Sequence, residues 1–153
     1  MFPKIKEPNP PTSQAIIEDF ESTRELTLPS LYKTFLLASN GGRPSPLTFP
    51  IEGMALNPLG AVHFFFGIGA RLSAYDLASV YDLYAAGLPK SIVPIACTDG
   101  DDFVCLDLRD GGERVAFWDR RHFWGTGEWR EGDLYHVANS FEEFLASLRP
   151  NPH

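Results

Sequence analysis

The sequence is poor in cysteine and in long apolar runs, and each shortage excludes a class of protein. Cys97 and Cys105 are its only cysteines in 153 residues, too few for a disulfide framework and without the CxxC spacing of a zinc site. The longest uncharged run, residues 53–70, is interrupted by Pro58, by glycines and by His63, so it predicts no transmembrane helix. We therefore expect no membrane span and a reducing, cytoplasmic location.

Basic charge is also scarce. The chain has 13 basic and 20 acidic residues, a formal net charge of -7, which is the wrong sign for binding a phosphate backbone. Motifs of the types GxGxxG, GxxxxGK[ST] and GxSxG are missing, and the four histidines lack metal-ligand spacing. The sequence thus predicts no direct nucleic-acid binding, no metal, no cofactor and no enzymatic activity.

The acidic excess is concentrated in one part of the chain. Seven acidic residues lie between Asp99 and Asp119, against only Arg109 and Arg114. Two glycine and aspartate turns, residues 98–101 and 109–113, fall in this segment. It is the feature that a functional interpretation has to explain.

Helical spacing of apolar residues predicts four amphipathic helices, in residues 13–22, 28–39, 73–87 and 140–148. Ser13 is placed as an N-cap of the first, and Asn40 predicts a left-handed stop after the second. The third is expected to begin at Ser73. Ser140 and Glu143 form a capping box at the last.

Four short apolar runs predict strands, in residues 61–68, 92–97, 103–108 and 114–118. The tight turns between the last three predict an antiparallel meander. The fold class is therefore α+β, with a mixed, largely antiparallel sheet packed against amphipathic helices in a single domain. Residues 13–150 are assigned to this domain, residues 1–12 to a proline-rich flexible arm without a secretory signal, and residues 43–60 to a proline-rich connection.

The order of these signals resembles the SUKH superfamily, in particular the branch named after the yeast Smi and Knr cell-wall regulators. The resemblance covers roughly residues 13–149 and rests on a set of fragments in sequence order: Leu28-Pro29, Tyr32-Lys33, Asn40-Gly41-Gly42, Pro94-Ile95-Ala96, Asp99 to Asp102, Cys105-Leu106, Phe117-Trp118-Asp119 and Ser140-Phe141. The sequence departs from the family where Arg120-Arg121-His122 follows the Trp-Asp pair.

The resemblance implies a protein-binding domain. Many bacterial members act as immunity proteins that bind and neutralise a polymorphic toxin, often a nuclease, whereas fungal members look like regulators of cell-wall synthesis and signalling. A cognate toxin or another basic protein is the expected partner, and a regulatory or scaffolding module without a toxin is the alternative.

Asp99, Asp101, Asp102 and Asp119 are the candidate partner-binding residues. A negative patch on a meander would steer and dock a basic partner, whereas the simpler interpretation is that these residues satisfy turn geometry and face water. A cation site and a hydrolase that pairs Asp99 and Asp102 with a histidine lack a positive motif.

The two cysteines and the aromatic residues near Trp118 each allow two interpretations. Cys97 and Cys105 could face each other across a hairpin or remain reduced and buried, and we favour the buried state. Trp118 is expected in the core under a loop from Phe123 to Trp129, a region that could instead form an aromatic and arginine contact surface.

Overall fold

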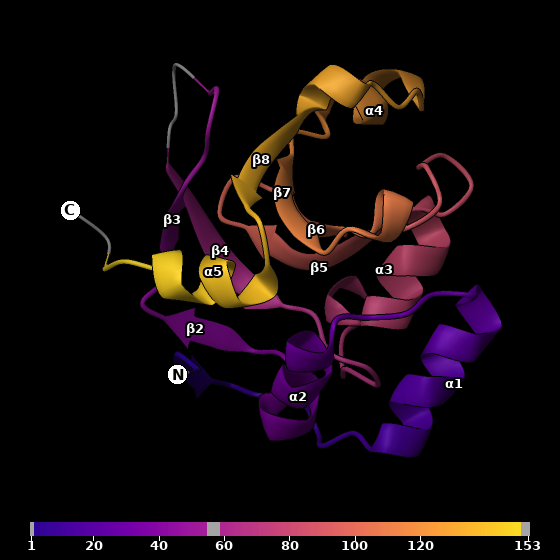
Figure 1. Ribbon diagram of the computed structural model, residues 1–153, viewed down its shortest axis with the longest axis vertical. Coiled ribbons are helices and arrows are strands. Elements are labelled where there is room, and N and C mark those ends of the chain that lie inside the picture. The colour runs from indigo at the N-terminus through magenta and orange to yellow at the C-terminus, as the bar shows by residue number, and fades with distance from the viewer. Residues whose placement is uncertain (1, 55–58, 151–153) are drawn as a thin grey trace.

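The structure is a computed structural model, and it describes residues 2–54 and 59–150 (Figure 1). Its helices are α1 (Gln14–Arg24), α2 (Ser30–Ser39), α3 (Leu77–Tyr84), α4 (Arg121–Thr126) and α5 (Phe141–Ser147). Its strands are β1 (Lys4–Lys6), β2 (Arg43–Ser45), β3 (Thr48–Pro50), β4 (Leu59–Phe65), β5 (Ile92–Thr98), β6 (Phe103–Asp107), β7 (Arg114–Trp118) and β8 (Leu134–Ala138). Short 3-10 turns lie at Ser73–Tyr75, Arg109–Gly111 and Glu131–Asp133.

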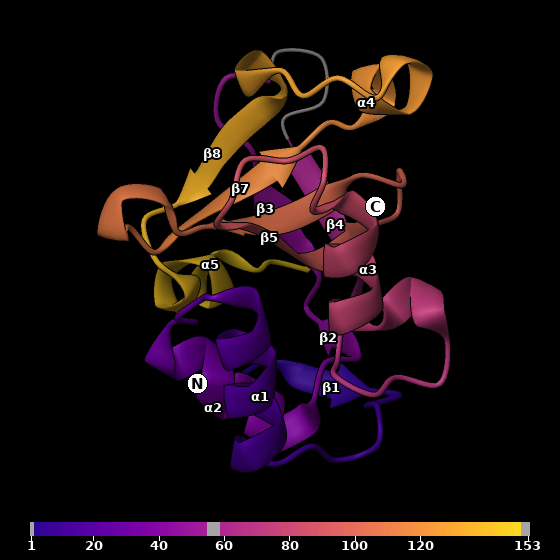
Figure 2. The same cartoon turned by 90° about the vertical axis from the view of Figure 1, so that its right-hand side faces the viewer.

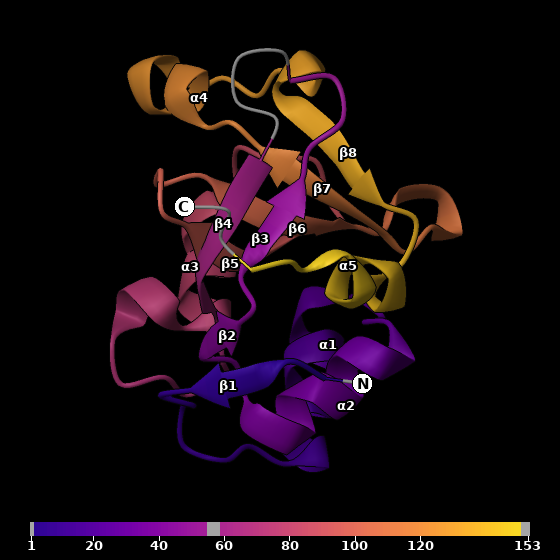
Figure 3. The same ribbon diagram turned by 90° about the vertical axis from the view of Figure 1, so that its left-hand side faces the viewer.

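Six strands form one antiparallel sheet in the order β3-β4-β5-β6-β7-β8, and β1 pairs antiparallel with β2 in a second, two-stranded sheet. The sheet curves strongly (Figure 1), with α1 and α2 at one end of the molecule, α4 at the other, and α5 between the sheet and the α1 and α2 end (Figures 2 and 3). The α+β class and the meander from β5 to β7 are confirmed.

The core is an aromatic cluster between α2, α5 and β4. The Phe35 ring lies 4.9 Å from Phe65 and 5.4 Å from Phe141 in edge-to-face geometry, and all three are almost completely buried. Such pairs contribute beyond the burial of their area, so this cluster joins the helical end to the sheet.

The predicted helix boundaries agree with the capping contacts. The Ser13 hydroxyl accepts the amide of Ile16 at 3.2 Å, and Asn40 ends α2 in the left-handed conformation with φ 53°. At α5, the Ser140 hydroxyl accepts the Glu143 amide, while the Glu143 carboxylate accepts the amide of Asn139.

Several segments differ from the sequence-based expectation, and strands β2, β3 and β8 were not predicted. Residues 4–6, expected in a flexible arm, form β1, because they pair with residues 43–45 of the proline-rich connection. Residues 55–58 of that connection lie outside the described residues. The third helix begins at Leu77, since the Asp76 carboxylate caps it and Ser73 belongs only to a 3-10 turn. The expected loop after Phe123 contains α4 instead, which closes the far end of the sheet.

None of the described helices combines the length and the apolar character needed to cross a lipid bilayer.

Candidate partner-binding surface

The four predicted aspartates lie at one end of the sheet. Asp99, Asp101 and Asp102 occupy the turn between β5 and β6, and Asp119 directly follows β7. Phe103 and Trp118 are paired in the ladder, so Asp102 and Asp119, the residues next to them, become neighbours. The structure thus brings together residues that are 17 to 20 positions apart in sequence.

The four carboxylates differ in their access to solvent. The Asp99 side chain is 56% exposed and Asp101 is exposed, whereas Asp102 is half-buried. The Asp119 side chain is only 11% exposed and receives two hydrogen bonds from the Arg121 guanidinium, at 3.0 Å and 2.7 Å, and one from the Arg121 backbone amide at 3.2 Å. Asp99 and Asp101 can meet a partner directly, while Asp119 serves the local structure.

The pKa values of Asp102 and Asp119 are shifted in opposite directions. Burial, helped by the nearby Asp119 charge, raises the pKa of Asp102 above its ordinary value. The Arg121 hydrogen bond lowers the pKa of Asp119, so that this carboxylate stays ionised within its ion pair.

Arg120 is the residue that organises this end of the sheet. Its Nε donates to the carbonyl of Asp101 at 2.5 Å, its Nη1 donates to the hydroxyl of Tyr84, and its backbone amide donates to Asp102 Oδ1 at 3.2 Å. Its guanidinium carbon also lies 4.0 Å from the centre of the Phe103 ring. Arg120 therefore holds the acidic turn against α3 and β6.

Sequence reasoning treated Arg120 as a departure from the family pattern and as one of the arginines of a possible aromatic and arginine contact surface, without assigning its contacts. Its partners come from α3, the β5–β6 turn and β6, and no spacing along the chain indicates that they converge. An arginine followed by a tryptophan four residues later, here Trp124, is the one local signal that could have suggested a helical stacking pair.

The three tryptophans have different environments. Trp118 is completely buried, which confirms the core prediction, and Trp129 packs on it with ring centres 5.5 Å apart. Trp124, on α4, is 59% exposed.

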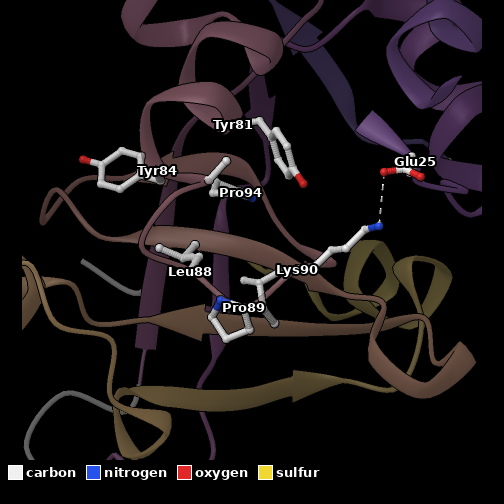
Figure 4. Close-up of a pocket in the computed structure, with 9 residues that line it drawn as sticks. Glu25, Tyr81, Tyr84, Leu88, Pro89, Lys90 and Pro94 are labelled. Carbon is white, nitrogen blue, oxygen red and sulfur yellow. Dashed lines mark ion pairs between the residues drawn. The ribbon is translucent and has the colours of Figure 1, made fainter. Parts of the chain in front are cut away.

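A recess of about 300 Å³ opens beside α3 (Figure 4). Tyr81 and Tyr84 of α3 line it together with Leu88, Pro89 and Pro94, and the rings of the two tyrosines point in different directions (Figure 4). At its rim Lys90 and Glu25 form an ion pair of 3.7 Å, and both side chains are largely exposed. Tyr84 lines this recess and also accepts a hydrogen bond from Arg120, which links the recess to the acidic turn.

Comparison with known proteins identifies the family. The model of the SMI1 / KNR4 family (SUKH-1) matches residues 11–147, most of the chain. The chain belongs to this family. It is also similar to the SPbeta prophage-derived uncharacterized protein YokK of Bacillus subtilis (strain 168), with 34% identity over 77 residues. These residues make up 50% of the chain and 36% of that relative, so the similarity spans about a third of the relative's length.

In this SUKH-1 chain the Asn40-Gly41-Gly42 motif acts in packing as well as in ending a helix. A Cβ on Gly41 would lie 2.5 Å from the Phe65 carbonyl oxygen, and one on Gly67 would collide with the carbonyl of Asn40. The glycines therefore allow the end of α2 to lie directly on β4.

The cysteines are free and buried, in agreement with the favoured interpretation. Cys97 is paired in the ladder with Phe103 and Cys105 with Pro94, so the hairpin staggers the two thiols. Burial raises the pKa of Cys97 to about 11 and raises that of Cys105 further, which keeps both thiols protonated at neutral pH.

The structure also places the residues of the cation-site and hydrolase interpretations. Within residues 2–54 and 59–150, no three histidine, cysteine or acidic side chains are arranged to hold a metal ion. Of the hydrolase pair, Asp99 lies 3.6 Å from Nδ1 of His63, whereas Asp102 hydrogen-bonds to the Arg120 amide.

Proposed function

We propose that this SUKH-1 domain is a non-enzymatic binding protein that neutralises a cognate polymorphic toxin in the cytoplasm. The family match over residues 11–147 carries the proposal. The family resemblance implies a toxin partner for bacterial members, often a nuclease, and a nuclease presents a basic cleft to its substrate.

The exposed carboxylates of Asp99 and Asp101 support a basic partner. They project from a turn whose backbone is held by Arg120, so little conformational freedom is lost when they pair with basic groups. Exposed interfacial charges mainly accelerate association and select the partner. Asp102 on the same turn is half-buried and the charge of Asp119 is paired with Arg121, so Asp99 and Asp101 are the two residues proposed to contact the partner.

Co-expression with a candidate toxin encoded next to this gene tests the proposal. We expect the chain to restore survival and to form a complex with the toxin. The double variant Asp99→Asn and Asp101→Asn should slow association about ten-fold at low salt and much less at high salt.

The matched control is Asp110→Asn with Glu113→Gln at the other end of the β6–β7 hairpin. It removes the same two charges, and Asp110, like Asp101, has a positive φ that asparagine tolerates. Equal loss of binding in both double variants would contradict docking through the acidic turn. Absence of both protection and complex, with several modest-affinity cellular partners instead, would favour the regulatory module.

A further inference from the structure

An exposed tryptophan extends the network that holds the acidic turn. The guanidinium carbon of Arg120 lies 4.4 Å from the centre of the Trp124 ring, as well as 4.0 Å from that of Phe103. Phe103, Arg120 and Trp124 together form what we call the Trp124 stack. It runs from the core strand β6 to the surface of α4, at the end of the sheet where the β5–β6 turn lies (Figures 2 and 3).

Arg120 fixes the position of the indole. The arginine is only 8% exposed, and its hydrogen bonds to Asp101 and Tyr84 leave its guanidinium plane little freedom. An aromatic side chain that packs on such a plane loses little further conformational entropy when a partner covers it. Rigid, solvent-exposed tryptophans of this kind are typical of the residues that dominate binding energy at interfaces.

The outer face of Trp124 remains available. Arg120 covers one face of the indole, yet 59% of the residue is exposed, so the opposite face is open to solvent. The charges around it are favourable to a cation. The backbone carbonyl of Asp101 accepts the Arg120 hydrogen bond, so the exposed side chains of Asp99 and Asp101 lie on the turn that adjoins Arg120, and the charge of Arg121 is already paired with Asp119.

We infer that the open face of Trp124 is a docking position for an arginine side chain of the partner. A planar, weakly hydrated guanidinium stacks on an aromatic face better than the compact ammonium of lysine does. The incoming arginine would add a fourth plane to the Trp124 stack, and the carboxylates of Asp99 and Asp101 would offset repulsion from Arg120. This inference rests on the proposed function and specifies the chemistry of the partner.

Two peptides that differ only in their cation test the inference without a toxin. An octapeptide of alternating arginine and glycine is compared with its lysine counterpart, and the indole N–H signals are followed by NMR. We expect the arginine peptide to bind about three-fold more tightly, with the largest shift at the Trp124 indole. Equal affinity for the two peptides, or an unmoved Trp124 signal at millimolar peptide, would overturn the inference.

Substitutions then assign the preference to the indole. Trp124→Ala and Trp124→Leu, of which the second keeps apolar bulk over Arg120, should both bind the two peptides equally. Leu83→Ala truncates another exposed side chain, 76% exposed on α3, and should keep the three-fold preference. A preference that survives in either Trp124 variant would refute the stacking position.

The toxin assay separates the two proposals. If the peptides behave as expected but the chain does not protect cells, the arginine position stands and the toxin proposal fails. If the chain protects cells and Trp124→Ala protects them equally, the toxin proposal stands and the arginine position is wrong.

Discussion

The side-chain amide of Asn40 hydrogen-bonds to the backbone of Ile68 in both directions. Its Nδ2 donates to the Ile68 carbonyl at 2.8 Å, and its Oδ1 accepts the Ile68 amide at 2.9 Å. The same Nδ2 donates to the carbonyl of Pro10, and Asn9 donates to the Asn40 carbonyl. One buried residue therefore joins the end of α2, the chain after β4 and the N-terminal segment.

Asn40→Ala should lower the free energy of unfolding by about 3 kcal/mol, because it leaves three partly buried backbone groups without their hydrogen bonds and places alanine at a positive φ. Asn40→Gly loses the same hydrogen bonds but tolerates φ 53°, so it should be about 1 kcal/mol less destabilising. Urea unfolding measures both. Asn139→Ala, at an exposed position, is the control, and equal loss in all three variants would contradict this role.

Tyr32 and Tyr84 should respond oppositely to replacement by phenylalanine. The Tyr32 hydroxyl is buried and has no hydrogen-bond partner in the described part of the chain, and burial raises its pKa. Tyr32→Phe should leave the free energy of unfolding unchanged or raise it by up to about 1 kcal/mol. Tyr84→Phe removes the acceptor of Arg120 and should lower it by about 1–2 kcal/mol. Thermal unfolding of the two variants measures the difference. A larger loss of stability in Tyr32→Phe than in Tyr84→Phe would refute the prediction.

The Asp107–Arg109 pair makes stability sensitive to acid. Burial favours protonated Asp107, but the hydrogen bonds and charge of Arg109 outweigh it and lower the pKa of that carboxyl. A lowered pKa stabilises the fold above the unfolded value of about 3.9, and this contribution disappears as the pH falls through the native pKa. Asp107→Asn should cost about 1.5 kcal/mol at pH 7 and flatten the stability curve below pH 4.

Asp102 provides the contrasting case. Burial raises the pKa of Asp102, so its ionisation opposes folding. The stability that protonated Asp102 contributes is lost as the pH rises from about 4 through the native pKa. Asp102→Asn retains an acceptor for the Arg120 amide and should be at least as stable as the wild type at pH 7. If both aspartate variants destabilise equally at pH 7, the assigned pKa directions are wrong.

Alkylation tests the burial of the two thiols. At pH 8 a thiol with a pKa of about 11 has on the order of 100-fold less thiolate than an ordinary cysteine, so Cys97 should react with iodoacetamide correspondingly slowly. Cys105, which is completely buried, should react only when the chain unfolds. Mass spectrometry with and without urea distinguishes the sites. Rapid native modification of Cys105 would contradict the fold around β6.

Much of the fold follows from local sequence signals. The side chains of Ser13 and Ser140 accept amides three residues away, and Asn40 ends α2 through its own left-handed conformation. The turns between β5, β6 and β7 impose antiparallel pairing without distant information. The three-residue strands β1, β2 and β3 and the five-residue strand β8 were missed, because their pairing depends on segments brought together by the rest of the fold.

The candidate surface was only partly predictable. The sequence identifies Asp99 and Asp101 as turn residues, and such residues face solvent in almost any context. It could not reveal that Asp119 is enclosed by its ion pair with Arg121, nor that Arg120 lies between the acidic turn and Trp124, since these depend on the side-chain directions at the end of β7.

By itself, the sequence determined the α+β class, the meander, the main helices and the SUKH-1 family, because capping, periodicity and turn chemistry act over short distances along the chain. Only the tertiary structure decided which acidic residues reach solvent and which aromatic side chain stays exposed. Those properties arise where α3, α4 and the β5–β6 turn meet, and burial and charge pairing there depend on residues that are neighbours in space alone.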